Sequence, residues 1–282
     1  ARGFVTRSKE TGAQSLERAM MAFSRVWHGS PHKFLLFDSS KIGTGEGAQA
    51  YGHGLYLAES KGVAGSYQES LSTDPERFLV DGKEVFRRQA NGPAFDVSDP
   101  KTAAIFYAAR KGDKAAREYF AEQGAWGGKA IAELDAMKGK AISRVAPGNL
   151  YQVDLPDEHI AKMLDWDKPL SEQTPEVRKL AEKFGYPLDR TGGDFQRWSS
   201  SPSGGLSINL RGPRDRSGLD KQSANMFSQA GIPGIRYLDG GSRSAGTGSS
   251  NFVAFDPEMI RILERNGQAT GLQPWKPGEW KR

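Results

Sequence analysis

Residues 51–58, Tyr-Gly-His-Gly-Leu-Tyr-Leu-Ala, constrain the fold of this chain more than any other stretch. Gly52 and Gly54 flank His53, and glycine lets a backbone turn sharply or approach another group closely because it has no side chain. The apolar run 55–58 predicts a short buried strand. The stretch therefore predicts a tight turn that leads directly into the core.

The residues after this strand predict a helix that returns toward it. Residues 61–71 have a helical pattern and carry Tyr67, eleven residues after Tyr56 of the strand. Two aromatic rings, one on a strand and one on a neighbouring helix, form a slot for a flat ring. We therefore expect a ligand with a planar ring at this place.

The composition favours a loop-rich α+β protein. Of 282 residues, 34 are glycine and 15 are proline, and 37% are hydrophobic. This length suffices for one elaborated domain or two small ones. The absence of cysteine excludes disulfides and thiolate metal sites and agrees with a reducing cytoplasm, of the producing cell or of a target cell. The opening Ala-Arg-Gly, without the apolar core of a signal peptide, predicts a fragment of a longer chain.

The charge and the hydropathy argue against nucleic acid and membrane as partners. The net charge of +5 is a small excess, and no basic cluster is interleaved with aromatic residues as a nucleic-acid platform would be. No apolar run approaches the roughly 20 residues of a membrane span. The sequence thus predicts no membrane partner and no dedicated nucleic-acid surface.

The pattern of turns and periodic segments predicts four parts of the chain. Residues 1–24 are expected to form an N-terminal helix or linker. A core is expected from 25–73 and 149–266, and an inserted, mainly helical subdomain from 74–148. Residues 267–282 have no period and predict an irregular tail.

Individual elements are predicted within these parts. Strands are expected at 24–30, 78–80, 84–86, 149–155, 234–238, 251–255 and 260–263, with a hairpin turn at Asp81-Gly82. Helices are expected at 100–110, 113–123, 129–137, 158–166, 174–184 and 220–230, and a loose segment at 186–217.

Three motifs together resemble a known family. Residues 27–30 read Trp-His-Gly-Ser, the glycine-bracketed strand carries Tyr56, and Tyr67 follows at a spacing of eleven. This arrangement resembles the ADP-ribosyltransferases of the diphtheria-toxin and poly-ADP-ribose-polymerase class. Over residues 26–267 the chain is most similar to the transferase domains in large polyvalent proteins of phages and mobile elements, which share LYQVDLP, LDWDKPL, AGIPGIRYLDGGSR and NFVAFD.

The resemblance implies a fold, a substrate and a function. The fold would be an ADP-ribosyltransferase-like split antiparallel β-sheet core with an inserted helical subdomain. The substrate would be NAD, whose nicotinamide–ribose bond is cleaved through an oxocarbenium-like transition state. The expected function is mono-ADP-ribosylation of a macromolecule by a monomeric toxin or effector, with a protein rather than a nucleic acid as acceptor.

The resemblance also assigns roles to individual residues. His28 would bind a ribose hydroxyl, and the rings of Tyr56 and Tyr67 would hold nicotinamide between them. The cofactor-binding set implied for NAD is His28, Gly29, Ser30, Gly54, Tyr56 and Tyr67. No metal site is expected, because neither His32 nor His53 has further ligands with suitable spacing.

One residue departs from the family pattern. Asn251 stands where active polymerases of this class have a glutamate, and an amide carries no negative charge. Three explanations remain open: Asn251 suffices, an acid such as Glu46 or Asp239 substitutes for the glutamate, or the chain binds NAD or ADP-ribose without turnover. Hydrolysis of NAD with water as acceptor is the enzymatic alternative. In the loop before Asn251, Arg243 is either solvated or a contact for a phosphate or acidic target.

Overall fold

The computed structural model describes residues 23–42, 50–89, 97–202, 216–240, 243, 248–276 and 279. The predicted N-terminal helix and Glu46 lie outside these residues. The predicted α+β class is confirmed, since a large mixed sheet, a small antiparallel sheet and helices are all present. The chain divides into two compact units. One takes its described residues from Ala1–His28, Phe34–Ala64 and Leu150–Arg282, and the other comprises Gly29–Lys33 and Gly65–Asn149.

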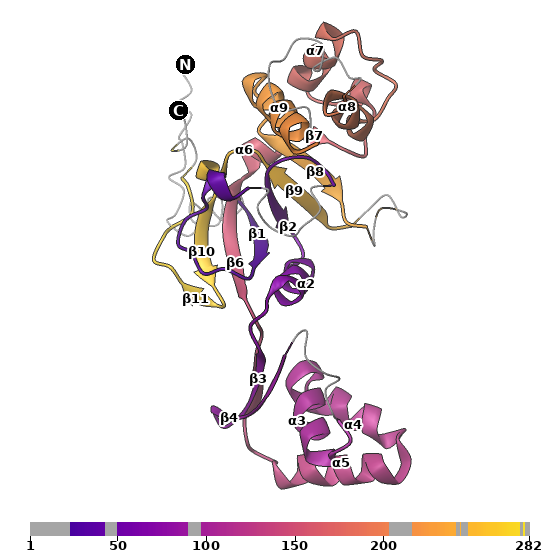
Figure 1. Ribbon diagram of the computed structural model, residues 1–282, viewed down its shortest axis with the longest axis vertical. Coiled ribbons are helices and arrows are strands. Elements are labelled where there is room, and N and C mark those ends of the chain that lie inside the picture. The colour runs from indigo at the N-terminus through magenta and orange to yellow at the C-terminus, as the bar shows by residue number, and fades with distance from the viewer. Residues whose placement is uncertain are drawn as a thin grey trace, which may run out of the picture. The chain divides into compact units, whose positions relative to one another are not determined.

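The first unit is built on the large sheet, whose described strands run in the order β11-β10-β6-β1-β2-β9-β8-β7 (Figure 1). These strands are β1 (Phe23–Ser30), β2 (Leu55–Ala58), β6 (Asn149–Pro156), β7 (Leu164–Asp165), β8 (Gly234–Leu238), β9 (Ser250–Ala254), β10 (Arg261–Arg265) and β11 (Gln268–Ala269).

The resemblance implied an antiparallel sheet, but the large sheet also contains a parallel pair of strands. β2 pairs antiparallel with β9, and β9 with β8, but β7 runs parallel to β8 with Leu164 opposite Ile235. The sheet is therefore mixed. At its other edge, β10 turns into β11 through Asn266 and Gly267, whose φ values are 51° and 77°. The prediction of an irregular tail from residue 267 is thus wrong at its start, because these two residues make a tight hairpin turn.

The two faces of this sheet belong to two apolar clusters. Along β9, Val253 packs into a cluster with Phe195 and Phe227, whereas Phe252 packs into a second cluster with Tyr151. Successive side chains of a strand point to opposite faces, so β9 contributes to both clusters. The first cluster is covered by the helices α7 (Pro175–Lys183), α8 (Gly192–Ser199) and α9 (Arg216–Gln229), which gather beside β7 and β8 in Figure 1.

Two predictions fail on this side of the sheet. The helix expected at 158–166 is only the short α6 (Asp157–Ile160), because Leu164 is taken into the parallel pair with β8. The segment expected to be loose at 186–217 contains α8. Thr191 and Asp194 form a capping box at its start. This capping box stabilises the start of α8, although the first two residues of the helix are glycines, which disfavour helix.

The second unit combines a three-stranded sheet with a helical group. The sheet has the order β4-β3-β5, with β3 (Glu76–Val80), β4 (Lys83–Arg88) and β5 (Ile142–Val145), and all its pairs are antiparallel. Asp81 and Gly82 adopt φ values of 48° and 75°, as the predicted hairpin turn requires. The strand β5 was not predicted.

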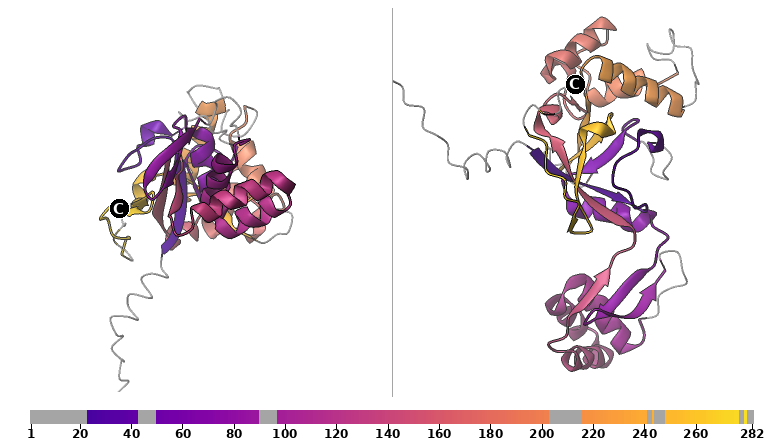
Figure 2. Two further views of the ribbon diagram at one scale, coloured as in Figure 1. Left: turned by 90° about the horizontal axis from the view of Figure 1, so that it is seen from below. Right: turned by 90° about the vertical axis from the view of Figure 1, so that its left-hand side faces the viewer.

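Helices pack on this small sheet through one apolar cluster. These helices are α3 (Pro100–Lys111), α4 (Asp113–Ala121) and α5 (Gly124–Ala136), whereas α2 (Lys61–Leu71) begins in the first unit and lies outside this cluster. Phe78 of β3 is fully buried together with Phe120 of α4 and Leu134 of α5. Asp99 caps the start of α3, since its carboxylate accepts a hydrogen bond from the Thr102 N–H at 2.8 Å. Figure 2 shows α3, α4 and α5 side by side.

A search of the described helices found none that combines the length and the apolar character of a membrane span.

Candidate functional site

The strand β2 occupies the middle of the candidate site, between β1 and β9. Ala58 lies opposite Trp27 on one side and opposite Asn251 on the other, and Tyr56 lies opposite Val253. Opposed residues of antiparallel strands share a face, as do residues two apart along one strand. Tyr56 and Asn251 are therefore diagonal neighbours on one face, a relation that places Cα atoms roughly 7–8 Å apart.

His28 on β1 is fixed by the backbone of β2. Its Nδ1 lies 2.9 Å from the carbonyl oxygen of Tyr56. A carbonyl oxygen only accepts, so Nδ1 carries the proton. Burial lowers the pKa of His28 below 6.5, although the hydrogen bond to Tyr56 opposes this shift. The ring is thus neutral at pH 7, and its Nε2 has a lone pair that can accept a hydrogen bond.

Aromatic rings hold the imidazole of His28 in place. Phe37 meets it edge-on at 5.2 Å between ring centroids, and Phe34 and Tyr151 lie at 6.2 Å. The Tyr151 hydroxyl in turn accepts a hydrogen bond from the Phe34 N–H at 2.9 Å. Phe34 and Phe37, which follow β1, therefore form an apolar wall beside His28.

The Tyr56 hydroxyl ties down the glycine turn that precedes β2. It donates to the carbonyl of Gly52 at 2.8 Å and accepts from the Tyr51 N–H at 3.2 Å. The ring of Tyr56 packs against the cluster that contains Val253. Tyr56 thus shapes the turn from which its own strand begins.

The two glycines of the turn meet protein atoms in this structure. A Cβ on Gly54 would lie 2.5 Å from Cγ1 of Val253 and 2.7 Å from the carbonyl oxygen of Ala254. Gly52 has φ of 112°, where L residues are strained, and a Cβ there would lie 3.0 Å from Nε2 of Gln196. The close approach predicted from sequence is accounted for by strand β9 and helix α8.

Asn251 is buried beside a carboxylate. Its side-chain Nδ2 lies 3.4 Å from Oδ1 of Asp239, which follows β8. Its Oδ1 is buried and accepts no hydrogen bond within the described part of the chain. A buried acceptor without a donor costs about 1–3 kcal/mol. Asn251 therefore presents an unsatisfied acceptor and has a negative charge within reach of its amide.

A second acid, which the sequence analysis did not single out, lies at the end of β2. The carboxylate of Glu59 accepts a hydrogen bond from the Ser250 N–H at 2.6 Å, and the Glu59 N–H donates to the Ser250 carbonyl at 3.0 Å. These bonds extend the β2–β9 pairing by one residue past Asn251. The only sequence signal is that an acid directly follows the apolar strand.

Arg243 is engaged within the protein. Its Nε lies 3.0 Å from Oδ1 of Asp167, and its guanidinium lies 5.4 Å from the ring centroid of Tyr51. Tyr51 stacks on Tyr237 at 3.8 Å, and Tyr237 is the partner of Asn251 in β8. The Arg243 N–H also donates to the carbonyl of Asp239 at 2.9 Å. Arg243 therefore anchors the segment that carries Asp239, and it is not a freely solvated loop arginine.

The structure brings together only part of the predicted set. Tyr56 and Asn251 share one face of the sheet, and the His28 ring packs with residues of the cluster on the other face. Gly29, Ser30 and Tyr67 belong to the second unit.

Within the second unit, Ser30 makes a local hydrogen bond and Tyr67 is exposed. The Ser30 hydroxyl accepts a hydrogen bond from the His32 N–H at 3.1 Å, which forms a local turn. The side chain of Tyr67 is 57% exposed, an unusual exposure for an aromatic ring on a helix.

A metal centre has no support in the described residues, where no group of three or more His, Asp or Glu side chains is placed to hold an ion. Comparison with known proteins gave no match, whether to a family model, a curated protein or a solved structure.

Proposed function

We propose that this chain is an NAD-dependent mono-ADP-ribosyltransferase, which cleaves the nicotinamide–ribose bond and transfers ADP-ribose to a macromolecule. The observation that carries the proposal is the pair Asn251–Asp239 on the face shared with Tyr56. The family motifs at residues 27–30 and 51–58 and the spacing from Tyr56 to Tyr67 give the proposal its substrate.

In this reaction nicotinamide leaves with the electron pair of the broken bond, and positive charge develops at the ribose carbon. A nucleophile of the acceptor then attacks that carbon and loses its proton. Negative charge near the ribose stabilises the developing cation. Asn251 has none, but its unsatisfied Oδ1 suits a ribose hydroxyl, and the Asp239 carboxylate 3.4 Å from its Nδ2 supplies the charge.

The resemblance gives His28 a contact with a ribose hydroxyl, but its ring packs on the face of the sheet opposite to Tyr56 and Asn251. We therefore give His28 a positioning role, in which its protonated Nδ1 holds the carbonyl of Tyr56 and so fixes β2 beside β1.

A binding module for NAD or ADP-ribose is the second candidate, and one observation favours it. The residue at the position of the family's glutamate is an amide that is 6% exposed and carries no charge. In this case Asp239 would orient Asn251 without contributing to bond cleavage.

Radiolabelled NAD, with the label in its adenylate phosphate, separates these functions. The full chain is incubated with the NAD and a cell lysate. Label on a macromolecule that protease removes and nuclease does not supports transfer to a protein. Free ADP-ribose without a labelled macromolecule indicates hydrolysis. Saturable NAD binding without either product indicates the binding module, and absence of binding refutes the NAD site.

The variant Asp239→Asn tests the observation that carries the proposal. We expect the rate of transfer to fall at least about tenfold, while the affinity for NAD changes little, because the charge matters most in the transition state. Asp189→Asn is the matched control, because Asp189 is an exposed aspartate of the same unit. An equal loss in both variants would contradict a special role for Asp239.

A further inference from the structure

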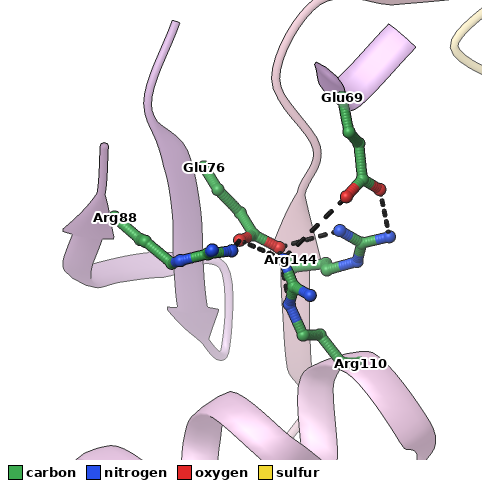
Figure 3. Close-up of polar contacts among 5 residues, drawn as sticks. All are labelled: Glu69, Glu76, Arg88, Arg110 and Arg144. Carbon is green, nitrogen blue, oxygen red and sulfur yellow. Dashed lines mark hydrogen bonds and ion pairs between the residues drawn. The ribbon is translucent and has the colours of Figure 1, made fainter. Parts of the chain in front are cut away.

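A cluster of three arginines and two glutamates lies in the second unit. Figure 3 shows Glu76 of β3 and Glu69 of α2 facing Arg88 of β4, Arg110 of α3 and Arg144 of β5. The side chain of Glu76 is 4% exposed, and those of the three arginines are 27–35% exposed. The cluster is therefore buried on the side of Glu76 and open on the side of the arginines.

Glu76 is held in its charged form. It accepts hydrogen bonds from Nη2 of Arg110 at 2.6 Å, from Nη1 of Arg144 at 2.7 Å and from Nη1 of Arg88 at 3.3 Å. Burial alone would raise the pKa of Glu76, but the hydrogen bonds from Arg110 and Arg144 outweigh burial and lower it. Glu76 therefore contributes one full negative charge.

The charges of the cluster do not balance. Arg144 is shared by both glutamates, since its Nη2 donates to Glu69 at 2.7 Å. Three guanidinium groups against two carboxylates leave one positive charge in excess. Arg88 makes a single hydrogen bond within the described residues, that at 3.3 Å to Glu76, although a guanidinium has five N–H donors. The excess charge is thus concentrated at Arg88.

Two of the three arginines, Arg88 and Arg110, line a cavity and lie against the aromatic ring of Phe106. The cavity has a volume of about 350 Å³ and is lined by Ser66, Ser70, Glu69, Glu76, Arg88 and Arg110. The guanidinium groups of Arg110 and Arg88 lie 4.9 Å and 6.0 Å from the ring centroid of Phe106. Stacking on an aromatic ring orients a guanidinium before any ligand arrives.

We propose that this cavity binds the phosphate group of a small ligand. A phosphate offers several oxygens in a tetrahedral arrangement, whereas a carboxylate offers two in a plane. The residues that line the cavity likewise approach it from different elements, because Arg88 and Arg110 come from a strand and a helix, and Ser66 and Ser70 lie one turn apart on α2. The Ser70 hydroxyl donates a long hydrogen bond of 3.3 Å to the Tyr67 carbonyl. Phosphate matches this set of donors better than a carboxylate does.

Calorimetric titration of the full chain with inorganic phosphate tests the proposal, at constant ionic strength adjusted with sodium chloride. We expect saturable binding, and we expect Arg88→Ala to weaken it at least about tenfold, because a charge-assisted pair of hydrogen bonds is lost. Arg87→Ala is the matched control. Arg87 is the neighbour of Arg88 on β4, its side chain is 62% exposed, and it pairs with Glu84 outside the cluster. Arg87→Ala should bind phosphate as the unmodified chain does.

Other outcomes overturn the proposal. No saturable binding of phosphate, or equal binding by Arg88→Ala, would leave the cluster a structural ion-pair network. Binding of acetate as tightly as phosphate would make the site a carboxylate site instead. Circular dichroism establishes that Arg88→Ala is folded, and Arg88→Gln, which keeps the length of the side chain, serves in its place if it is not. The test is independent of the proposed transferase activity, because no NAD is present.

Discussion

At the scale of single residues, Asn251 and Tyr67 differ in burial, and burial decides whether a substitution tests binding alone. Asn251 is 6% exposed and lies within the large sheet, so its replacement changes packing together with chemistry. Tyr67 is 57% exposed on α2. An exposed side chain contributes little to the free energy of unfolding, so its substitution isolates the binding role that the family resemblance assigns to it.

For Tyr67→Ala we therefore expect a change in unfolding free energy within about 0.5 kcal/mol and a loss of NAD affinity of at least about tenfold. Urea denaturation and calorimetric titration with NAD measure the two quantities. Tyr119→Ala on α4 is a control, because Tyr119 stacks on Tyr107 and is 39% exposed. That variant should lose stability and keep its affinity for NAD. If Tyr67→Ala binds NAD normally, the aromatic slot is misplaced.

At the scale of elements, glycines decide how closely strands and helices approach. Gly54 lies where β2 meets β9, and any Cβ there would collide with Val253 and Ala254. Gly65 lies inside α2, and a Cβ there would have no neighbouring atom within 4 Å. The same substitution should thus have opposite effects at these two positions.

We expect Gly54→Ala to lower the free energy of unfolding by about 1–3 kcal/mol, because overpacking forces the two strands apart. Gly65→Ala should raise it by about 0.5–1 kcal/mol, because alanine favours a helix interior over glycine. Urea denaturation measures both. A neutral Gly54→Ala would mean that the turn before β2 is looser than its contacts indicate.

At the scale of the whole molecule, one buried carboxylate links stability to pH. Asp154 of β6 is fully buried, and its Oδ1 has no hydrogen-bond partner in the described part of the chain. Its Oδ2 accepts from the Trp275 N–H at 2.7 Å. Burial raises the pKa of Asp154 from 3.8 to about 6, although the Trp275 N–H and Arg261 oppose the rise. The folded chain therefore holds this proton more tightly than the unfolded chain.

The sign of the pH dependence follows from this difference. Between pH 3.8 and about 6 the folded state binds more protons at Asp154, so its contribution to stability falls as the pH rises and is constant above pH 6. A rise in pKa of about two corresponds to a loss of about 3 kcal/mol. Asp154→Asn should remove this loss, so that the variant matches the unmodified chain near pH 4 and exceeds it in stability at pH 7.

Urea denaturation at pH 4, 5, 6 and 7 measures the effect of Asp154→Asn. Other carboxyl groups also titrate in this range, so the quantity to compare is the difference between variant and unmodified chain at each pH. Asp189→Asn, at an exposed position, should show no such difference. A difference that does not grow between pH 4 and pH 7 would contradict the raised pKa of Asp154.

Several elements were determined by the sequence alone. The bounds of β2 and α2 agree with the predicted ranges 55–58 and 61–71, and the β3–β4 hairpin turns at Asp81-Gly82 as predicted. Apolar periodicity and turn residues act over a few neighbouring positions, so these elements are specified locally. The strand of the motif at residues 51–58 also lies within the large sheet, between β1 and β9.

Tertiary structure alone decided the rest. Gly192 and Gly193 suggested a loose segment, but a Cβ on either would collide with Asp165 or Trp166, so the glycines permit α8 to pack against the end of β7. Leu164 became a strand residue because Ile235, far along the chain, offered a parallel partner. Asp239 could be nominated from sequence, but only the pairing of β8 with β9 places it beside Asn251. Such contacts depend on which strands are neighbours in the sheet, and that order is fixed by burial of the whole core and not by any local pattern.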